Sequence, residues 1–390
     1  MDLAATPSLP RLHAAPDRWP NSDAQVRTLT PAEIRSPEFI AAWQELATRA
    51  SEPNPFFEHW FAQNSFDHLG ADEAPVLFAH FTRGELTGLL PLARKNRYFG
   101  YPVPHVTSWL HTNAFCGSPL VARGSEREFW RALLTHLDDA PGRALFLHLP
   151  EMPADGPLNA ALDAVLAKDA RLAGTVEAVE RAVLAPALGT HNPQSYLEAS
   201  ISSKKRKELR RQRKRLAEMG ELGFERRDDG ADIDAWIAEF LALEAAGWKG
   251  KAGSALASAP ETKGFFTGAL TSAARAQKLE RLTLRLDCKP IAMLANFITL
   301  PGAFSFKTAF DETYARFSPG LLLQIENLDL LARPGFEWAD SCAVEGHSMI
   351  ERIWREKRPI ISRNIAIGGR LRRSAFRALM AYETRGQTRK

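Results

Sequence analysis

The spacing of apolar residues predicts helices alternating with strands in the first half of the chain. Residues 31–50 repeat apolar positions with a helical period, while 75–81 and 86–93 are typical of the two strands of a hairpin. Further helices are expected at 55–64, 126–137 and 158–170, and further strands at 144–149 and 176–184. Residues 99–119 are rich in aromatic, Pro and His residues and show no clear period.

The second half of the chain begins with a long basic helix over 195–219 and continues in the order β-α-α-β-β-β-α-β-α-β. The strands are predicted at 222–227, 279–287, 291–300, 303–310, 336–340 and 359–367, and the helices at 233–246, 261–277, 320–332, 348–356 and 371–382. A central antiparallel meander with helices at both ends indicates a mixed α/β sheet with helices on both faces.

The length of 390 residues suggests two or three domains. We expect a flexible N-terminal segment over 1–30, which is rich in Ala and Pro, and a first domain over 31–185. A linker at 186–193 would lead to a second domain over 194–390, which includes a basic helix at 203–219.

The composition is that of a soluble globular protein, with 45% hydrophobic and 25% charged residues. The three cysteines are scattered, so no disulfide framework is expected, and a reducing, cytoplasmic location is the simplest interpretation. The N-terminus lacks the pattern of a signal peptide, and no apolar run approaches the ~18 residues of a membrane span. Neither the Cys nor the ten His residues show metal-ligand spacing, so no metal is predicted.

Positive charge is concentrated in one segment. Lys204 to Arg215 holds nine basic residues and one acid, Glu208, a balance of +8 that leaves the rest of the chain at −4 against the total of +4. Such a helix could bind tRNA, a phosphorylated sugar or lipid, an acidic carrier protein or an anionic surface, or it could be a solvated helix that contacts acidic residues elsewhere. It has no interleaved aromatic residues, so sequence-specific nucleic-acid binding is not expected.

The segment 304–331 predicts a strand, a short polar loop and a helix that begins near Ser318-Pro319-Gly320. Backbone N–H groups at the start of that helix, with the helix dipole behind them, suit a phosphate or pyrophosphate. Lys307 and Asp311 lie on the strand side of the same loop. The sequence therefore places potential chemistry and anion binding together.

Lys307 is a charged residue in an otherwise apolar and aromatic strand. Strict alternation would put Ser305, Lys307 and Ala309 on one face. Lys307 could stabilise an oxyanion or hold an acidic substrate group, or it could form a structural ion pair with Asp311. Asp311 in turn could be a general base, could orient Lys307, or could cap the loop.

Other candidates lie outside that segment. Glu244 is a second possible general base, and Trp248 with Lys249 could form one wall of an acceptor pocket, although Trp248 could equally be a core residue. His347 could act as an acid or base, or be structural. A cluster in the first half could line an acceptor cleft between the domains or be a packed loop; its members are His105, Trp109, His111, Asn113 and Phe115.

Several motifs of the second half occur in one order over about residues 195–350. They are the basic run 202–215, Glu244 with Gly247-Trp-Lys-Gly250, Phe306-Lys-Thr-Ala-Phe-Asp311, Tyr314 with Phe317-Ser-Pro-Gly320, and Asp340-Ser-Cys-Ala with Gly346-His-Ser. Together they resemble the CelD/FemAB-like acyltransferases, bacterial-type proteins that pair two GNAT-like domains in one chain. The first half resembles the other GNAT-like domain loosely, chiefly through Gly88-Leu-Leu-Pro-Leu92.

This resemblance implies tandem GNAT folds and an N-acyltransferase that uses no covalent intermediate. The acyl donor, acyl-CoA, would lie along a strand that splays from its neighbour and bind the loop of Arg316, Phe317, Ser318 and Gly320. Pro319 stands where the family pattern has a further backbone donor. The catalytic candidates are then Lys307, Asp311 and Glu244, and the substrate-binding candidates are Trp248, Lys249, His347 and Trp109.

The acceptor implied by the resemblance is the amine of a small molecule or of a cell-envelope precursor. Fem-type enzymes take an aminoacyl group from tRNA, so an aminoacyl-tRNA donor is the alternative to acyl-CoA. A non-catalytic GNAT-like protein that binds polyanions through its basic helix is the other alternative.

Overall fold

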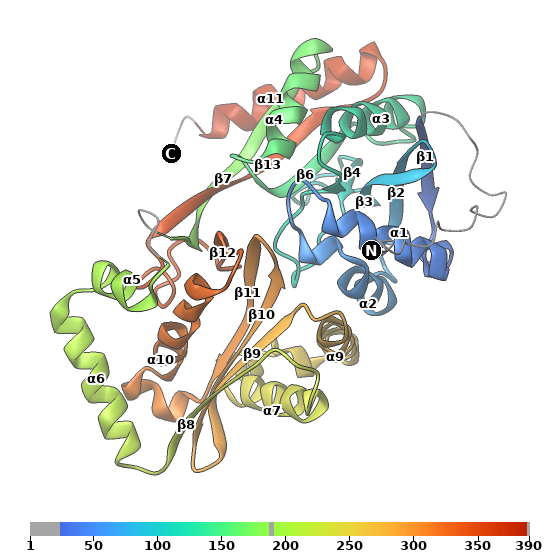
Figure 1. The fold of residues 1–390 in the computed structure, drawn as a ribbon. Coiled ribbons are helices and arrows are strands. Elements are labelled where there is room, and N and C mark those ends of the chain that lie inside the picture. Colours follow the sequence, from blue (N-terminus) through green and yellow to red (C-terminus); the bar gives the residue numbers. More distant parts are fainter. Residues whose placement is uncertain (1–23, 187–190, 388–390) are drawn as a thin grey trace, which may run out of the picture.

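The structure, a computed structural model, describes residues 24–186 and 191–387 (Figure 1). Its described strands are β1 (Ala24–Leu29), β2 (Val76–Thr82), β3 (Glu85–Lys95), β4 (His105–Ser108), β5 (Leu120–Val121), β6 (Phe146–Pro153), β7 (Ala173–Leu184), β8 (Leu222–Arg227), β9 (Leu279–Leu286), β10 (Lys289–Thr299), β11 (Gly302–Phe310), β12 (Trp338–Asp340) and β13 (Glu356–Ala366). The described helices are α1 (Pro37–Thr48), α2 (His59–Leu69), α3 (Glu126–Asp139), α4 (Pro157–Lys168), α5 (Pro193–Ser200), α6 (Ser203–Ala217), α7 (Ile233–Ala246), α8 (Trp248–Lys251), α9 (Pro260–Arg275), α10 (Pro319–Glu326) and α11 (Arg370–Gln387). Short 3-10 helices include η2 (Pro55–Phe57), η5 (Glu312–Phe317) and η6 (Asn327–Ala332).

All of these strands belong to one mixed sheet. Its order is β1-β2-β3-β4-β6-β13-β7-β12-β11-β10-β9-β8, with β5 paired to β3. The predicted mixed α/β architecture with helices on both faces is therefore confirmed. The hairpin of β2 and β3 and the meander of β9, β10 and β11 are both present as predicted.

The sheet continues without a break from the first half of the chain into the second. Strand β7 pairs with β13 along most of its length and with β12 at its end, where Leu184 lies opposite Ala339. Strand β13, from the end of the chain, lies between β6 and β7 of the first half. The division into 31–185 and 194–390 stays a prediction, and residues 356–366 pair with the strands of its first part.

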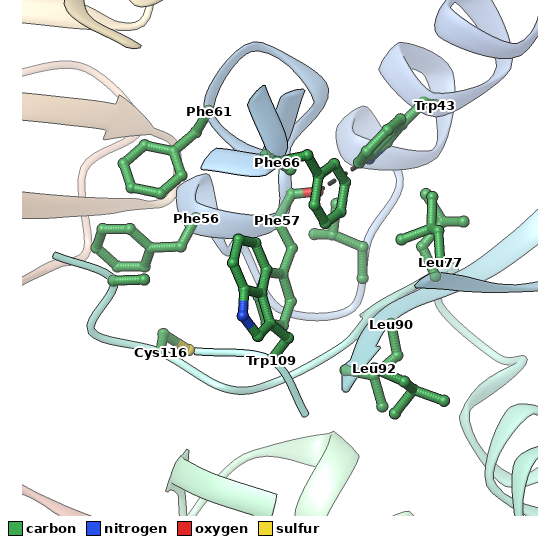
Figure 2. Close-up of a cluster of buried hydrophobic side chains, with 14 of the residues drawn as sticks. Trp43, Phe56, Phe57, Phe61, Phe66, Leu77, Leu90, Leu92, Trp109 and Cys116 are labelled. Carbon is green, nitrogen blue, oxygen red and sulfur yellow. Dashed lines mark hydrogen bonds between the residues drawn. The ribbon is translucent and has the colours of Figure 1, made fainter. Parts of the chain in front are cut away.

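One aromatic core joins the two halves. Phe56 of η2 lies 5.4 Å from Phe304 of β11 between ring centroids, and Trp60 of α2 lies 4.9 Å from Phe297 of β10. Figure 2 shows part of this core, where the indole N–H of Trp43 donates to the carbonyl of Phe57 over 2.9 Å. Because so much aromatic surface is shared, the two halves pack as neighbouring layers of one interior.

A second core lies on the other face of the β8–β12 part of the sheet. Apolar residues of α5, α6 and α10 pack there against β10, whereas α7 and α9 cover the opposite face. The basic helix contributes Leu209 and Leu216 to this core, and its cationic residues lie around that narrow apolar stripe. None of the described helices is long and apolar enough to cross a membrane.

Five predicted elements differ in the structure. The helix expected over 55–64 is divided into η2 and α2, and α2 continues to Leu69. The helix expected over 195–219 is divided into α5 and α6, because the hydroxyl of Ser202 accepts from the backbone N–H of Lys205 and starts a new helix. The helix expected over 320–332 is the α-helix only through Glu326 and continues as η6. Residues 348–356 form turns instead of the expected helix.

The fifth difference concerns the predicted flexible segment 1–30. Residues 24–29 form strand β1, which pairs antiparallel with β2. Residues 1–23 of that segment, and 187–190 of the predicted linker, lie outside the described residues.

Candidate functional site

Strands β11 and β12 separate in the middle of the sheet. They pair in parallel from Gly302 and Trp338 to Phe304 and Asp340, and then β12 ends while β11 continues to Phe310. Among the described residues, no strand pairs with β11 on that side beyond Phe304. Residues 305–310 therefore offer a free backbone edge beside the junction of the two halves, as the family resemblance predicts.

A β-bulge in β11 determines where Lys307 points. Ser305 lies opposite Asn296 and Lys307 lies opposite Ala295, so Phe306 is the extra residue. The expected alternation of Ser305, Lys307 and Ala309 on one face is therefore wrong. The bulge moves Lys307 to the face of α7 and the shared aromatic core, while Ser305 stays on the face of α10.

Lys307 lies among aromatic rings and forms no ion pair with any described residue. Its Nζ is 5.1 Å from the ring centroid of Phe115 and 5.5 Å from that of Phe306. Burial and, after it, the positive charge of Lys249 lower the pKa of Lys307 to about 8, against smaller opposite effects of Glu244 and Cys342.

The buried Glu244 and the half-buried Lys249 form an ion pair close enough to Lys307 to affect its pKa. The carboxylate of Glu244 accepts from Lys249 Nζ over 2.7 Å and from the backbone N–H of Leu256 over 2.8 Å. Trp248, which precedes Lys249 in the chain, is 60% exposed, and its backbone N–H donates to the carboxylate of Glu312 over 2.7 Å. The core position considered for Trp248 is therefore excluded.

Asp311 does not contact Lys307. Its carboxylate caps η5 by accepting from the backbone N–H of Thr313 over 3.0 Å, and it pairs with Lys289 Nζ over 2.8 Å. Burial alone would raise the pKa of Asp311, but the hydrogen bonds from Lys289 and Thr313 outweigh it and hold the pKa below its ordinary value. Of the interpretations considered from the sequence, this arrangement matches the loop cap, with Lys289 rather than Lys307 as the ion-pair partner.

Arg181 of β7, which sequence reasoning missed, connects the two halves at the splay. Its guanidinium donates to Glu151 over 2.7 Å, to Asp340 over 3.4 Å and to the carbonyl of Phe115 over 2.6 Å. Burial alone would lower the pKa of Arg181, but Asp340 and Glu151 raise it above its ordinary range. Beside this network, burial and then the charge of Asp340 raise the pKa of the Cys342 thiol, so it is protonated at neutral pH.

A cavity of about 410 Å³ opens beside this network in the first half. Its lining includes His105, His111 and Phe115 of the predicted cluster, together with Glu151. Burial and the nearby Lys307 lower the pKa of His111 to about 3, so its imidazole is neutral. Asn113, another member of the cluster, is buried beside it, where its backbone N–H donates to the His111 ring.

Trp109, predicted to bind substrate, is a core residue instead. It is 3% exposed and stacks on Phe66 with ring centroids 5.3 Å apart, as Figure 2 shows. A large side chain in an irregular segment gave no signal that separates a cavity wall from a core position. The neighbouring residues Ser108 and Leu110 line the cavity in its place.

The predicted donor loop leads into α10 with an unusual start. Ser318 has a positive φ of 55°, no side chain caps α10, and Pro319 is its first residue. A Cβ at Gly320 would lie 2.7 Å from the thioether of Met349, so this glycine permits close packing. Arg316 is exposed and lies 4.7 Å above the ring of Phe317, which is buried.

Beside the first turn of α10 lies a cavity of about 600 Å³ with a basic lining. Its lining includes three cations, Lys205 of α6 and Arg352 and Arg355 of the turns after His347, together with one acid, Glu351, and apolar residues such as Leu321 of α10. These arginines were not predicted, because the segment was expected to be a helix and its cations have no motif. His347 itself is half-buried, lies beside Glu351, and contacts none of the residues around Lys307 by any described interaction.

Comparison with known proteins gives one family and a set of similar folds. Residues 203–347 match the family described as acetyltransferase (GNAT) domain. The structure of FemX is similar at a TM-score of 0.54 and 10% identity, covering 84% of this chain and 96% of that chain. No curated protein sequence is significantly similar to this chain.

Two further solved structures are similar in fold. The C-terminal domain (DUF2156) of a putative lysylphosphatidylglycerol synthetase from Agrobacterium fabrum has a TM-score of 0.51 and 13% identity, over 84% of this chain and 92% of that chain. L-PGS from Bacillus licheniformis has a TM-score of 0.50 and 13% identity, over 87% of this chain and 93% of that chain. At these identities the likeness concerns the fold.

Replacing Arg181 with Met should destabilise the protein by about 3–5 kcal/mol, because the nearly inaccessible carboxylate of Asp340 would lose its counter-charge. Urea unfolding would measure the loss. The double variant Arg181→Met/Asp340→Asn should be more stable than Arg181→Met alone. Arg227→Met, which removes an exposed ion pair with Asp229, is the control and should change stability little. Equal effects of the two single variants would contradict the bridging role of Arg181.

Proposed function

Because residues 203–347 match the acetyltransferase (GNAT) domain family and the fold is similar to that of FemX, we propose that this chain transfers an acyl group from a thioester donor to an amine. The observation that carries this proposal is the position of Lys307. It lies on the free part of β11, where the bulge turns it toward the junction of the two halves, and burial lowers its pKa to about 8. A cation that forms no ion pair with a described residue suits a place where negative charge develops.

The proposed donor is acyl-CoA, bound along the free edge of β11. Amide groups of its pantetheine arm would pair with the backbone of residues 305–310, as an added strand does. Its phosphates would lie near the uncapped start of α10, next to Arg316 and the basic cavity of Lys205, Arg352 and Arg355. These three cations supply positive charge where Pro319 lacks a backbone N–H.

The proposed reaction is direct attack of the amine on the acyl carbonyl. A C–N bond forms, the tetrahedral oxyanion is stabilised by Lys307, and the C–S bond then breaks with release of the thiol. Both carboxylates accept from a lysine, Glu244 from Lys249 and Asp311 from Lys289. Glu244 is the preferred acceptor of the amine proton, because it is close enough to Lys307 to affect its pKa, whereas Asp311 is not among the groups that do so. The protonated state of Cys342 agrees with a route that has no acyl-enzyme.

The proposed acceptor, a small-molecule or cell-envelope amine, enters through the 410 Å³ cavity. The cavity lining reaches Phe115, whose ring lies 5.1 Å from Lys307 Nζ. Trp248 and Lys249 would border the same reaction centre from α8. The family resemblance leaves aminoacyl-tRNA as the alternative donor. The proposed function also includes a CelD-like assignment and a cytoplasmic location.

A second candidate function is docking on a polyanion through α6. Two of its cations form ion pairs, Lys205 with Glu208 and Arg213 with Glu326. Six others are exposed and have no ion pair within the described residues; they are Lys204, Lys207, Arg210, Arg211, Lys214 and Arg215. This ridge would suit an acidic carrier protein, an anionic surface or the phosphates of tRNA.

Lys307→Met should reduce kcat by at least ~10²-fold, because the oxyanion would lose its stabilising cation. In wild type, the acceleration that depends on Lys307 should decline as the pH rises through about 8, since only the ammonium form stabilises an anion. Initial rates with acyl-CoA across that range would test both expectations. Activity close to wild type would remove Lys307 from the mechanism.

The stability of Lys307→Met provides the control for folding. The pKa of Lys307 is lower in the folded protein than its ordinary value of 10.5, so its charge destabilises the fold fully below about pH 8. That penalty is lost as the pH rises toward the ordinary value. The variant should therefore keep or raise the Tm at neutral pH, while the exposed Lys263→Met should change neither activity nor Tm.

Arg352→Ala should raise KM for acyl-CoA about tenfold and leave kcat nearly unchanged, because a lost phosphate contact weakens ground and transition state alike. Steady-state kinetics and calorimetry with CoA would measure this. The exposed Arg127→Ala is the matched control. If wild type binds no acyl-CoA, the donor proposal is wrong and an aminoacyl-tRNA or carrier-protein donor replaces it.

Changing Lys204, Lys207, Arg211 and Lys214 to Gln should weaken binding to tRNA or heparin. The slope of log K against log salt concentration should become less steep by about 3–4, because four phosphate contacts are lost. The control changes four exposed cations elsewhere, Arg83, Arg127, Lys168 and Lys263, and so has the same net charge. Retained acyl transfer in the α6 variant would assign docking to this helix. Equal binding by both variants would exclude it.

A further inference from the structure

A strained turn holds an aromatic ring in the lining of the 410 Å³ cavity. Tyr98 and Tyr101 exchange two backbone hydrogen bonds of 2.9 and 3.0 Å around Phe99 and Gly100. Both central residues have positive φ, 45° for Phe99 and 83° for Gly100. Such a turn favours Asn or Gly at its first central position, and a bulky side chain is strained there.

Burial of the Phe99 side chain does not offset the strain of its backbone. Its side chain is 74% exposed, although it touches Tyr98 with ring centroids 4.7 Å apart and lines the cavity. Asn would adopt this turn with less strain, and the exposed ring of Phe99 contributes little buried surface to the stability of the fold. This combination points to a ligand that the ring contacts.

Two neutral imidazoles lie behind this turn. The ring of Tyr98 is 5.4 Å from that of His105 and 5.6 Å from that of His148, and both histidines line the cavity. Burial lowers the pKa of each. The cavity therefore has an aromatic and imidazole wall that carries no charge at neutral pH.

Hydrogen bonds determine which nitrogen of each imidazole is free. His105 Nδ1 is 3.2 Å from the carbonyl of Val103, which can only accept, so Nδ1 carries the proton. His148 Nδ1 donates to the side-chain oxygen of Asn364 over 2.8 Å, and the amide of Asn364 is oriented by its bond to Tyr98. Each Nε2 is thus a hydrogen-bond acceptor, and neither has a partner within the described residues.

The charged residues of the cavity lining each have at least one hydrogen-bond partner within the protein. Lys95 pairs with Glu73 over 2.8 Å, and Arg97 donates to the carbonyl of Gly100 over 2.9 Å. Glu151, on the inner side, is paired with Arg181. The Nε2 atoms of the two histidines are therefore acceptors without a partner in the described cavity lining, and they suit a ligand with hydroxyl donors.

We propose that this cavity binds the pyranose ring of an amino sugar, with one apolar ring face on Phe99 and hydroxyls donating to His105 and His148. A sugar ring has both an apolar face and O–H donors, which this wall of rings and bare nitrogens matches. A volume of about 410 Å³ is within the ~300–1,000 Å³ range of small-molecule sites. The amino group would reach Lys307 along Phe115, so the inference rests on the proposed function and names its acceptor class.

The test compares Phe99→Asn with wild type. Asn suits the left-handed turn, so the variant should fold at least as stably while it loses the ring. Calorimetry with a β-1,4-linked glucosamine oligomer, without donor, should show affinity reduced at least ~5-fold, and KM for that acceptor should rise equally. Phe99→Tyr should stay near wild type, as should Tyr101→Asn, since Tyr101 is exposed but does not line the cavity.

The outcomes separate this inference from the proposed function. Acyl transfer to lysine amide without binding of the glucosamine oligomer would overturn the sugar site and leave the acyltransferase. Oligomer binding that depends on Phe99, with no transfer to any amine, would support the sugar site and overturn the acyltransferase. Affinity that Phe99→Asn does not change, or binding of a nucleotide or peptide in place of the oligomer, would also overturn the sugar site.

Discussion

The guanidinium of Arg181 occupies the point on which the site depends, where β11 and β12 separate and the two halves of the chain meet. It binds a carboxylate of each half, Glu151 and Asp340, and the carbonyl of Phe115. Burial makes each charge costly unless the others are present, so the three positions constrain one another. The wall of the 410 Å³ cavity and the end of β12 are thereby held in one arrangement beside the free edge of β11.

The aromatic core around this junction explains the properties of Lys307. Rings from η2, α2, β10 and β11 exclude water across the boundary between the halves, and Lys307 is left with Phe115 and Phe306 as its neighbours. The bulge leaves Phe306 without a paired residue on β10 and directs the side chain of Lys307 toward these rings. A lysine that folding disfavours in its charged form, at the edge of a splayed sheet, is what a stabiliser of developing negative charge requires.

The residues of the proposed mechanism lie on both faces of the sheet. On one side, α7, α8 and the first half surround Lys307 and the acceptor cavity. On the other, α6 and the turns before β13 bring Lys205, Arg352 and Arg355 to the start of α10. In the proposed mechanism, anion binding and acyl chemistry meet along β11, the strand that both faces share. The cations of α6 that face solvent lie outside this arrangement and are available to a partner.

The sequence by itself determined the fold class, most elements and the strand–loop–helix of residues 304–331, because apolar periodicity and turn residues act over a few positions. The order of its motifs also led to the family. Tertiary structure alone decided the face of Lys307, because a bulge depends on the register with β10. Only the tertiary structure shows that Asp311 pairs with Lys289, that Trp109 is buried against Phe66, and that Arg181 lies between Glu151 and Asp340. The partners in each of these contacts are distant in the chain. Residues 356–366 likewise returned to the first half to complete its sheet, a pairing that no local pattern encodes.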